Sequence, residues 1–189
     1  MPKQKTAKIV LGLIGEIAAG KDTVADYLKK NYHSQTVSFS QPLRDILNRL
    51  YLPINRKNMD DLGISLRQAF GQDLLSRVIY AEVKQTKSKL VVLPNIRLES
   101  DMVYLKTLPE FYLVSVDCDT KTRFARLKKR RQNADDRTKT WRQFLSDSRV
   151  PLQQQIRRIA KRAKFQLDNN GTKQELFRQI EQLMKDIKK

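Results

Sequence analysis

The segment from residue 7 to residue 31 constrains the fold of this chain more than any other. Residues 7–14 (AKIVLGLI) form a nearly continuous apolar run, and residues 15–23 (GEIAAGKDT) hold two glycines and a lysine in the spacing G-x-x-x-x-G-K. Residues 21–31 then carry apolar side chains on one helical face. A strand buried on both faces of a parallel sheet has the first pattern. The sequence therefore predicts a strand, a glycine-rich turn and a helix in direct succession.

This turn has the chemistry of a phosphate-binding site. Glycines allow backbone N–H groups to surround phosphate oxygens, and the helix that begins near Gly20 directs its positive end at them. Lys21 supplies a mobile cation for the outer phosphates. Either Asp22, which occupies the usual Ser or Thr position of such loops, or Thr23 would act on Mg²⁺, directly or through water. We predict that the phosphates of ATP contact Gly15, Glu16, Ile17, Ala18, Ala19, Gly20, Lys21, Asp22 and Thr23.

Strand and helix patterns alternate along the rest of the chain. Further strands are predicted at residues 36–39, 90–93, 112–116 and 165–167. Helices are predicted at residues 42–50, 64–70, 73–85 and 101–108, from a cap at Thr120 to residue 131, from Trp141 onward, and after a cap at Thr172. The pattern predicts a three-layer α/β P-loop NTPase fold with a five-stranded parallel sheet. Its ligand should lie at the carboxyl ends of the strands.

The composition fits a single domain over residues 1–189. Hydrophobic residues make up 40% of the chain, and no apolar stretch approaches the roughly 20 residues that a membrane helix needs. The short basic start leads straight into a strand pattern, so we expect a cytoplasmic protein without membrane contact. Cys118 is the only cysteine, which excludes a disulfide framework, and no Cys and His cluster is present for zinc.

The charge of the chain favours anionic partners. The net charge is +18, and residues 120–189 contribute most of it, with 21 Lys and Arg against 7 Asp and Glu. Such a field attracts nucleotides, coenzymes or RNA.

The glycine-rich segment also carries a family resemblance. Residues 15–28 (GEIAAGKDTVADYL) resemble the opening of the deoxynucleoside monophosphate kinases and of related dephospho-coenzyme A kinases, in which a Gly-Lys-Asp-Thr form of the loop also occurs. The likeness covers nearly the whole chain, through residues 38–44 (SFSQPLR), 66–77 (LRQAFGQDLLSR), 95–97 (NIR), 123–131 (RFARLKKRR) and 167–172 (LDNNGT).

The resemblance implies a role for several segments. Acceptor-binding helices would span about residues 41–86, and a helical lid about residues 120–164. The acceptor's phosphate would be bound by Arg44, Arg67, Arg77 and Arg97, whose planar guanidinium groups suit phosphate oxygens. The catalytic residues would be Lys21, Arg126 and Arg130, with the lid arginines neutralising charge on the transferring phosphoryl group. Spacings of three and four put Arg123 on the same helical face as these two arginines. Adenine would lie beside Asn170 and Gly171.

Two positions depart from the pattern of these kinases. Related enzymes usually carry Asp where this chain has Gln41, and an Asp-Gly pair where Leu93 is followed by Pro94 and Asn95. An acidic residue at the end of that strand would orient Mg²⁺ or accept a proton. Among the remaining carboxylates, Asp117 is best placed, at the end of a predicted strand.

Two functions are compatible with these features. The first is Mg²⁺-dependent transfer of the γ-phosphoryl group of ATP to a nucleoside monophosphate or a similar small nucleotide, with dephospho-coenzyme A as the alternative acceptor. The second is an ATP-binding protein that has lost phosphoryl transfer and associates with RNA or a ribonucleoprotein. The missing carboxylates and the basic C-terminal third favour the second function, whereas the lack of an RNA-binding motif counts against it.

Overall fold

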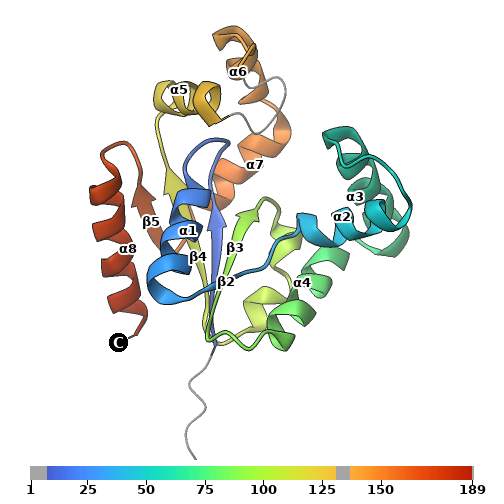
Figure 1. Cartoon of the computed structure of the whole chain (residues 1–189), viewed down its shortest axis with the longest axis horizontal. Coiled ribbons are helices and arrows are strands. Elements are labelled where there is room, and N and C mark those ends of the chain that lie inside the picture. Colours follow the sequence, from blue (N-terminus) through green and yellow to red (C-terminus); the bar gives the residue numbers. More distant parts are fainter. Residues whose placement is uncertain (1–7, 131–136, 189) are drawn as a thin grey trace, which may run out of the picture.

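A five-stranded parallel sheet forms the centre of the computed structural model, which describes residues 8–130 and 137–188 (Figure 1). The strands lie in the order β2-β3-β1-β4-β5, and every neighbouring pair is parallel. Because β1 is the middle strand, the segment that follows it emerges at the centre of the sheet's carboxyl edge. The strands are β1 (Ile9–Ile14), β2 (Gln35–Thr36), β3 (Leu90–Ile96), β4 (Phe111–Asp117) and β5 (Phe165–Asp168).

Helices cover both faces of the sheet. Alternate residues of β1 point to opposite faces, so Leu11 joins one buried cluster and Val10 the other. On the first face lie α1 (Lys21–Tyr32) and α8 (Lys173–Ile187). On the second lie α2 (Ser40–Arg49), α3 (Arg56–Phe70), α4 (Leu74–Gln85), α7 (Pro151–Ala160) and the 3₁₀ turns η1 (Glu99–Met102) and η2 (Leu105–Thr107). The predicted three-layer α/β fold is confirmed.

Two helices stand beyond the strand tips: α5 (Thr120–Arg130) and α6 (Trp141–Asp147) (Figure 1). The predicted single helix from Trp141 is wrong, because the first helix ends at Asp147 and a second begins at Pro151. Proline is tolerated at a helix start, where its missing N–H would have no partner within the helix. The lid was expected to extend to residue 164. However, α7 buries Ile156 and Ile159 in the core on the sheet. Among the described helices of the expected lid, α5 and α6 therefore lie above the carboxyl edge and α7 does not.

Strand β3 runs three residues further than predicted. The register passes from Gly12 opposite Leu93 to Ile14 opposite Ile96, so β3 has one extra residue in a bulge at Pro94 and Asn95. A bulge tolerates proline, because the extra residue makes no ladder hydrogen bond. The proline therefore does not end the strand.

Side chains near two other elements explain further differences. The 3₁₀ turns η1 and η2 replace a predicted helix at residues 101–108, and the Asp101 carboxylate accepts the backbone N–H groups of Arg97 and Leu98. The predicted helix at residues 64–70 starts earlier, because Asn55 caps it by accepting the N–H of Asn58 at 2.8 Å.

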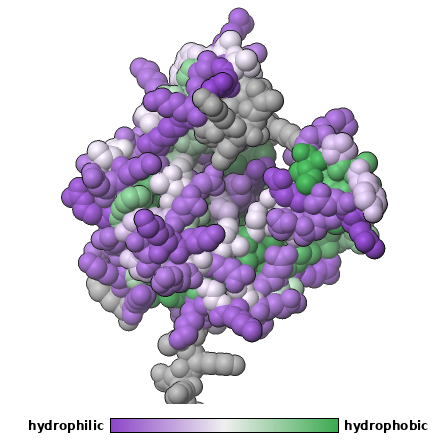
Figure 2. Space-filling view, in the orientation of Figure 1, coloured by the Kyte–Doolittle hydropathy of each residue, from purple (hydrophilic) through white to green (hydrophobic). Residues whose placement is uncertain are grey.

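The connection between α2 and α3 carries exposed apolar residues. Four of its residues are exposed: Leu50, Tyr51, Leu52 and Ile54. Figure 2 shows hydrophobic side chains gathered over the region of α2 and α3, on an otherwise largely hydrophilic face. Within the described residues, no helix is long and apolar enough to cross a membrane.

Candidate functional site

The segment Gly15–Thr23, called the glycine loop below, joins β1 to α1 in a tight turn. An added Cβ at Gly15 would lie 2.4 Å from the carbonyl oxygen of Val116 in β4. Gly20 has a φ of +104°, and its Cβ would lie 2.0 Å from Nδ2 of Asn169. Ala18 also has a positive φ, of 60°. Packing against β4 thus requires glycine at position 15, and the φ of +104° together with the closeness of Asn169 requires it at position 20, whereas Ala18 adopts its positive φ with a side chain.

Lys21 turns back onto the loop from the first turn of α1. Its Nζ donates to the carbonyl oxygens of Gly15 at 2.7 Å and of Glu16 at 3.1 Å. Asp22 beside it is exposed, and Thr23 is half-buried. The ammonium group therefore lies against the loop that the sequence assigns to phosphate.

The loop after β5 supports the glycine loop from the other side. The Asn169 side chain is buried and donates from Nδ2 to the carbonyl oxygen of Ala19 at 2.7 Å, while its backbone N–H donates to the backbone carbonyl oxygen of Asp117 at 2.8 Å. The sequence pattern indicated the next two residues as ligand contacts but gave no signal for Asn169. Of those two, Asn170 accepts the N–H of Asp119 at 2.7 Å, and Gly171 is exposed. Their contact with adenine stays a prediction.

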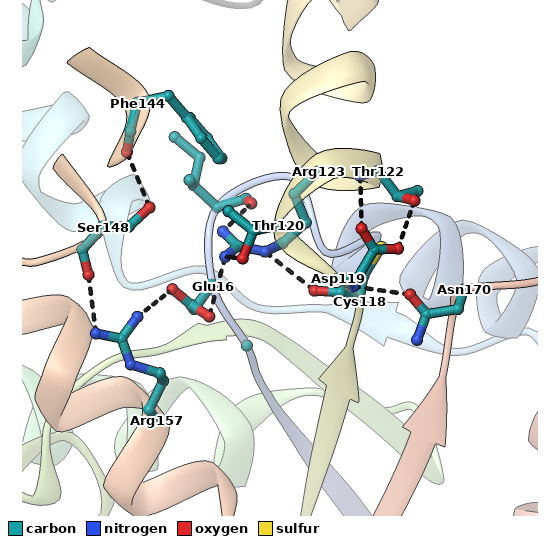
Figure 3. A network of polar contacts seen from close by, with 12 residues as sticks. Glu16, Cys118, Asp119, Thr120, Thr122, Arg123, Phe144, Ser148, Arg157 and Asn170 are labelled. Carbon is teal, nitrogen blue, oxygen red and sulfur yellow. Dashed lines mark hydrogen bonds and ion pairs between the residues drawn. The ribbon is translucent and has the colours of Figure 1, made fainter. Parts of the chain in front are cut away.

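The arginines of α5 have different environments. Arg123 is 2% exposed, and its Nε donates to the carbonyl oxygen of Cys118 at 3.1 Å (Figure 3). Arg126 is half-buried, and its Nη1 contacts Sγ of Cys118 at 3.3 Å. The same nitrogen lies 4.0 Å from a Cβ added at Gly20, which places Arg126 beside the glycine loop. The side chain of Arg130 lies outside the described residues.

A charged network that the sequence analysis missed connects the loop to α5 and α7. The carboxylate of Glu16 pairs with Arg123 at 3.1 Å and with Arg157 at 2.7 Å (Figure 3). The contact of Glu16 with phosphate stays a prediction for its backbone N–H, because its carboxylate is bound to two guanidinium groups. No local pattern could have revealed this, since the partners are more than 100 positions apart.

The four arginines assigned to the acceptor come from α2, α3, α4 and the segment after β3, which all belong to the β2 and β3 side of the sheet. Arg67 is half-buried and lies 3.5 Å from the buried carboxylate of Asp101. Arg44, Arg77 and Arg97 are exposed, and none forms an ion pair with another described residue. Their guanidinium groups remain available to an anion, whereas Arg67 is already partly engaged.

The carboxylates near the loop also differ. Asp117 is exposed at the end of β4. Asp119, rather than the predicted Thr120, caps α5: it accepts the N–H of Thr122 at 2.9 Å. The hydroxyl and then the N–H of Thr122 hold the pKa of Asp119 below its usual value, which makes it a poor proton acceptor. Burial raises the pKa of the Cys118 thiol, although the nearby Arg126 opposes that shift.

Comparisons with known proteins identify a family and a fold for this chain. A family model described as "AAA domain" matches residues 14–142. Two UPF0200 proteins are similar to this chain over nearly their whole length. The protein of Methanococcus maripaludis is 24% identical, and the match covers 94% of this chain and 97% of that protein. The protein of Thermococcus gammatolerans is 27% identical, and the match covers 95% of this chain and 94% of that protein. Among solved structures, shikimate kinase from Bacteroides thetaiotaomicron has a TM-score of 0.66 at 13% identity, over 96% of this chain and 99% of that one. Shikimate kinase from Aquifex aeolicus has a TM-score of 0.53 at 14% identity, over 94% and 97%.

Proposed function

The chain belongs to the AAA domain family and has a P-loop kinase-like fold, and on that premise we propose that it transfers the γ-phosphoryl group of ATP to a nucleoside monophosphate or a similar small nucleotide. One observation carries the proposal. The glycine loop, with Lys21 folded against it, opens at the carboxyl edge between α5 on one side and the arginine-bearing helices α2 to α4 on the other. A phosphate donor and a phosphorylated acceptor would meet between them.

The residues divide into three roles. Loop N–H groups and Lys21 would hold the donor phosphates. Arg126, which lies beside Gly20 and hydrogen-bonds to the thiol of Cys118, would neutralise charge on the transferring group. Arg44, Arg77 and Arg97 would bind the acceptor's phosphate with their exposed guanidinium groups.

The residues at the start of α1 also fit Mg²⁺. Protein sites hold Mg²⁺ through one or two carboxylates, with water and substrate phosphates completing the coordination. Within the described residues, no group of three His, Cys, Asp or Glu could form a closed metal site. Asp22 and Thr23, on the first turn of α1, fit the open type. Bound there, Mg²⁺ would supply positive charge to the donor phosphates.

The carboxylates favour a phosphate over a hydroxyl as the acceptor. A hydroxyl must lose a proton to attack, and a carboxylate usually accepts it. On the acceptor side, the bulge of β3 holds Pro94 and Asn95 in place of a carboxylate, and the carboxylate of Asp101 is occupied by two backbone N–H groups and Arg67. A monophosphate is already anionic near neutral pH, because its second pKa is about 6. It therefore needs no base, which ranks it above dephospho-coenzyme A.

An acceptor-dependent assay of ADP release tests this proposal. We expect turnover with one or more nucleoside monophosphates, and little with dephospho-coenzyme A. Lys21→Ala should abolish turnover or weaken ATP binding without unfolding the protein. Lys30→Ala is the matched control, because Lys30 is an exposed lysine in the last turn of the same helix. Wild-type ATP affinity and turnover in Lys21→Ala would refute the assignment of the glycine loop.

The second candidate function, ATP-controlled association with RNA, is favoured by one observation. Several basic side chains in the C-terminal third of the chain are exposed. They include Lys128, Lys129, Arg142, Arg158 and Lys161. RNA titrations at two salt concentrations test it, since each phosphate contact that is lost makes the salt slope shallower by about one unit.

A further inference from the structure

Glu16 joins the glycine loop to two helices at once. Its Oε2 lies 3.1 Å from Nη2 of Arg123 in α5, and its Oε1 lies 2.7 Å from Nη1 of Arg157 in α7 (Figure 3). The Glu16 side chain is only 14% exposed. A single carboxylate therefore sits between two guanidinium groups in a poorly hydrated position, where such contacts are stronger than on an open surface.

Arg123 extends this contact into the loop and into α6. Its Nη1 donates to the carbonyl oxygen of Ile17 at 3.4 Å. Its guanidinium group lies 5.4 Å from the ring centroid of Phe144. The residue is almost fully buried, so it cannot leave this position to follow a ligand without exposing the aromatic ring and unpairing Glu16.

Arg157 reaches the same helix from its other end. Its Nη2 donates to the carbonyl oxygen of Ser148 at 2.9 Å, and the Ser148 hydroxyl donates to the carbonyl oxygen of Phe144, also at 2.9 Å. Phe144 stacks on Trp141, the only tryptophan of the chain, with centroids 6.0 Å apart. Contacts thus run without a gap from Glu16 to the aromatic residues of α6.

We propose that Glu16 is a positioning residue that couples the conformation of the glycine loop to the position of α6. It acts through Arg123 and Arg157 and touches no reacting atom. The coupling of α6 to ATP rests on the proposed function, but the coupling of α6 to the loop does not. If both guanidinium groups merely neutralised the charge of Glu16, removing that charge would not change the position of α6.

Hydrogen exchange of the protein without nucleotide tests the coupling itself. In Glu16→Gln, which keeps an acceptor but removes the charge, we expect exchange to quicken about tenfold or more both in residues 15–20 and in α6. The charge-assisted bonds that are lost hold Arg123 and Arg157, the two residues that contact α6, against the loop. Arg157→Gln should quicken exchange in the same two regions, and the double variant should add little. Asp61→Asn, which removes a carboxylate from an exposed ion pair with Lys57, is the matched control and should change neither. Faster exchange in the loop with an unchanged α6, or no change in either, would overturn the proposal.

The emission of Trp141 then connects the coupling to ATP. We expect ATP to alter Trp141 emission in the wild type, and saturating ATP to produce less than half of that change in Glu16→Gln. An equal change in the two proteins would contradict the coupling. A wild type that binds no ATP would refute the proposed function, and hydrogen exchange would still decide whether Glu16 joins the loop to α6.

Discussion

Replacing Gly20 by alanine should damage the glycine loop in two ways. The residue has a φ of +104°, which costs an L-residue with a side chain roughly 1–2 kcal/mol. The new Cβ would also lie 2.0 Å from Nδ2 of Asn169, the atom that donates to the carbonyl oxygen of Ala19. Displacing that buried donor adds about 1–3 kcal/mol.

Together these costs amount to about 2–5 kcal/mol of unfolding free energy. For a chain of this size, the corresponding fall in Tm is about 4–20 °C. Thermal unfolding followed by circular dichroism measures this loss, and calorimetry measures ATP binding, which should also weaken. Gly63→Ala is the matched control, because Gly63 is inside α3, and an added Cβ there meets nothing closer than the flexible end of Arg67 at 3.3 Å. Alanine should be neutral or slightly stabilising at that position.

Asn169→Ala separates the two costs. It removes the hydrogen bond but also removes the atom that collides with the new Cβ. Gly20→Ala combined with Asn169→Ala should therefore cost less than the sum of the single variants, leaving chiefly the backbone strain. Strict additivity, or a Gly20→Ala protein with unchanged stability and ATP affinity, would refute this account of the loop.

Three further predictions concern neighbouring residues. The pKa of Asp119 is lowered on folding, so its cap stabilises α5 fully above the unfolded value near 3.8 and loses its effect as pH falls through the folded pKa. Asp119→Ala should therefore lower the urea midpoint at pH 7, and this difference should shrink as the pH is lowered below 3.8. If the missing carboxylate limits turnover, Pro94→Asp with Asn95→Gly should raise the rate of phosphoryl transfer, whereas a wild-type rate already within about 1–100 per second would show that another group suffices. Arg126→Ala should reduce kcat more than ATP affinity, also at high salt; normal single-turnover chemistry together with impaired RNA binding would favour the second candidate function.

Much of the fold could be predicted because its strands are apolar and its loop signal is local. Three features are adjacent in sequence: the apolar run of residues 7–14, the glycine spacing and the start of α1. Each of these patterns is typical of a single kind of structure. The limits of β3 could not be predicted in the same way. Proline inside a strand is rare, and only pairing with β1 shows that a bulge accommodates Pro94.

The site was harder to predict because its supporting contacts join distant segments. Asn169 supports the carbonyl oxygen of Ala19, 150 positions away, and Arg157 pairs with Glu16, 141 positions away. Helical periodicity also could not separate α6 from α7, since both are amphipathic, and the boundary depends on Pro151. The buried contacts of α7 with the sheet then show that its apolar face is part of the core.

The two described arginines of α5 illustrate how burial assigns different roles to residues with similar spacing. Arg123 donates to the backbone of Cys118 and pairs with Glu16, so an arriving phosphate would have to replace strong contacts inside a buried position. The Nη1 of Arg126 contacts a thiol, which is a weak acceptor, and a phosphate oxygen beside Gly20 would be a much stronger one. Exchange of the partner is therefore favourable for Arg126 and costly for Arg123. We therefore propose that Arg126 responds to the ligand and that Arg123 holds the loop that receives it.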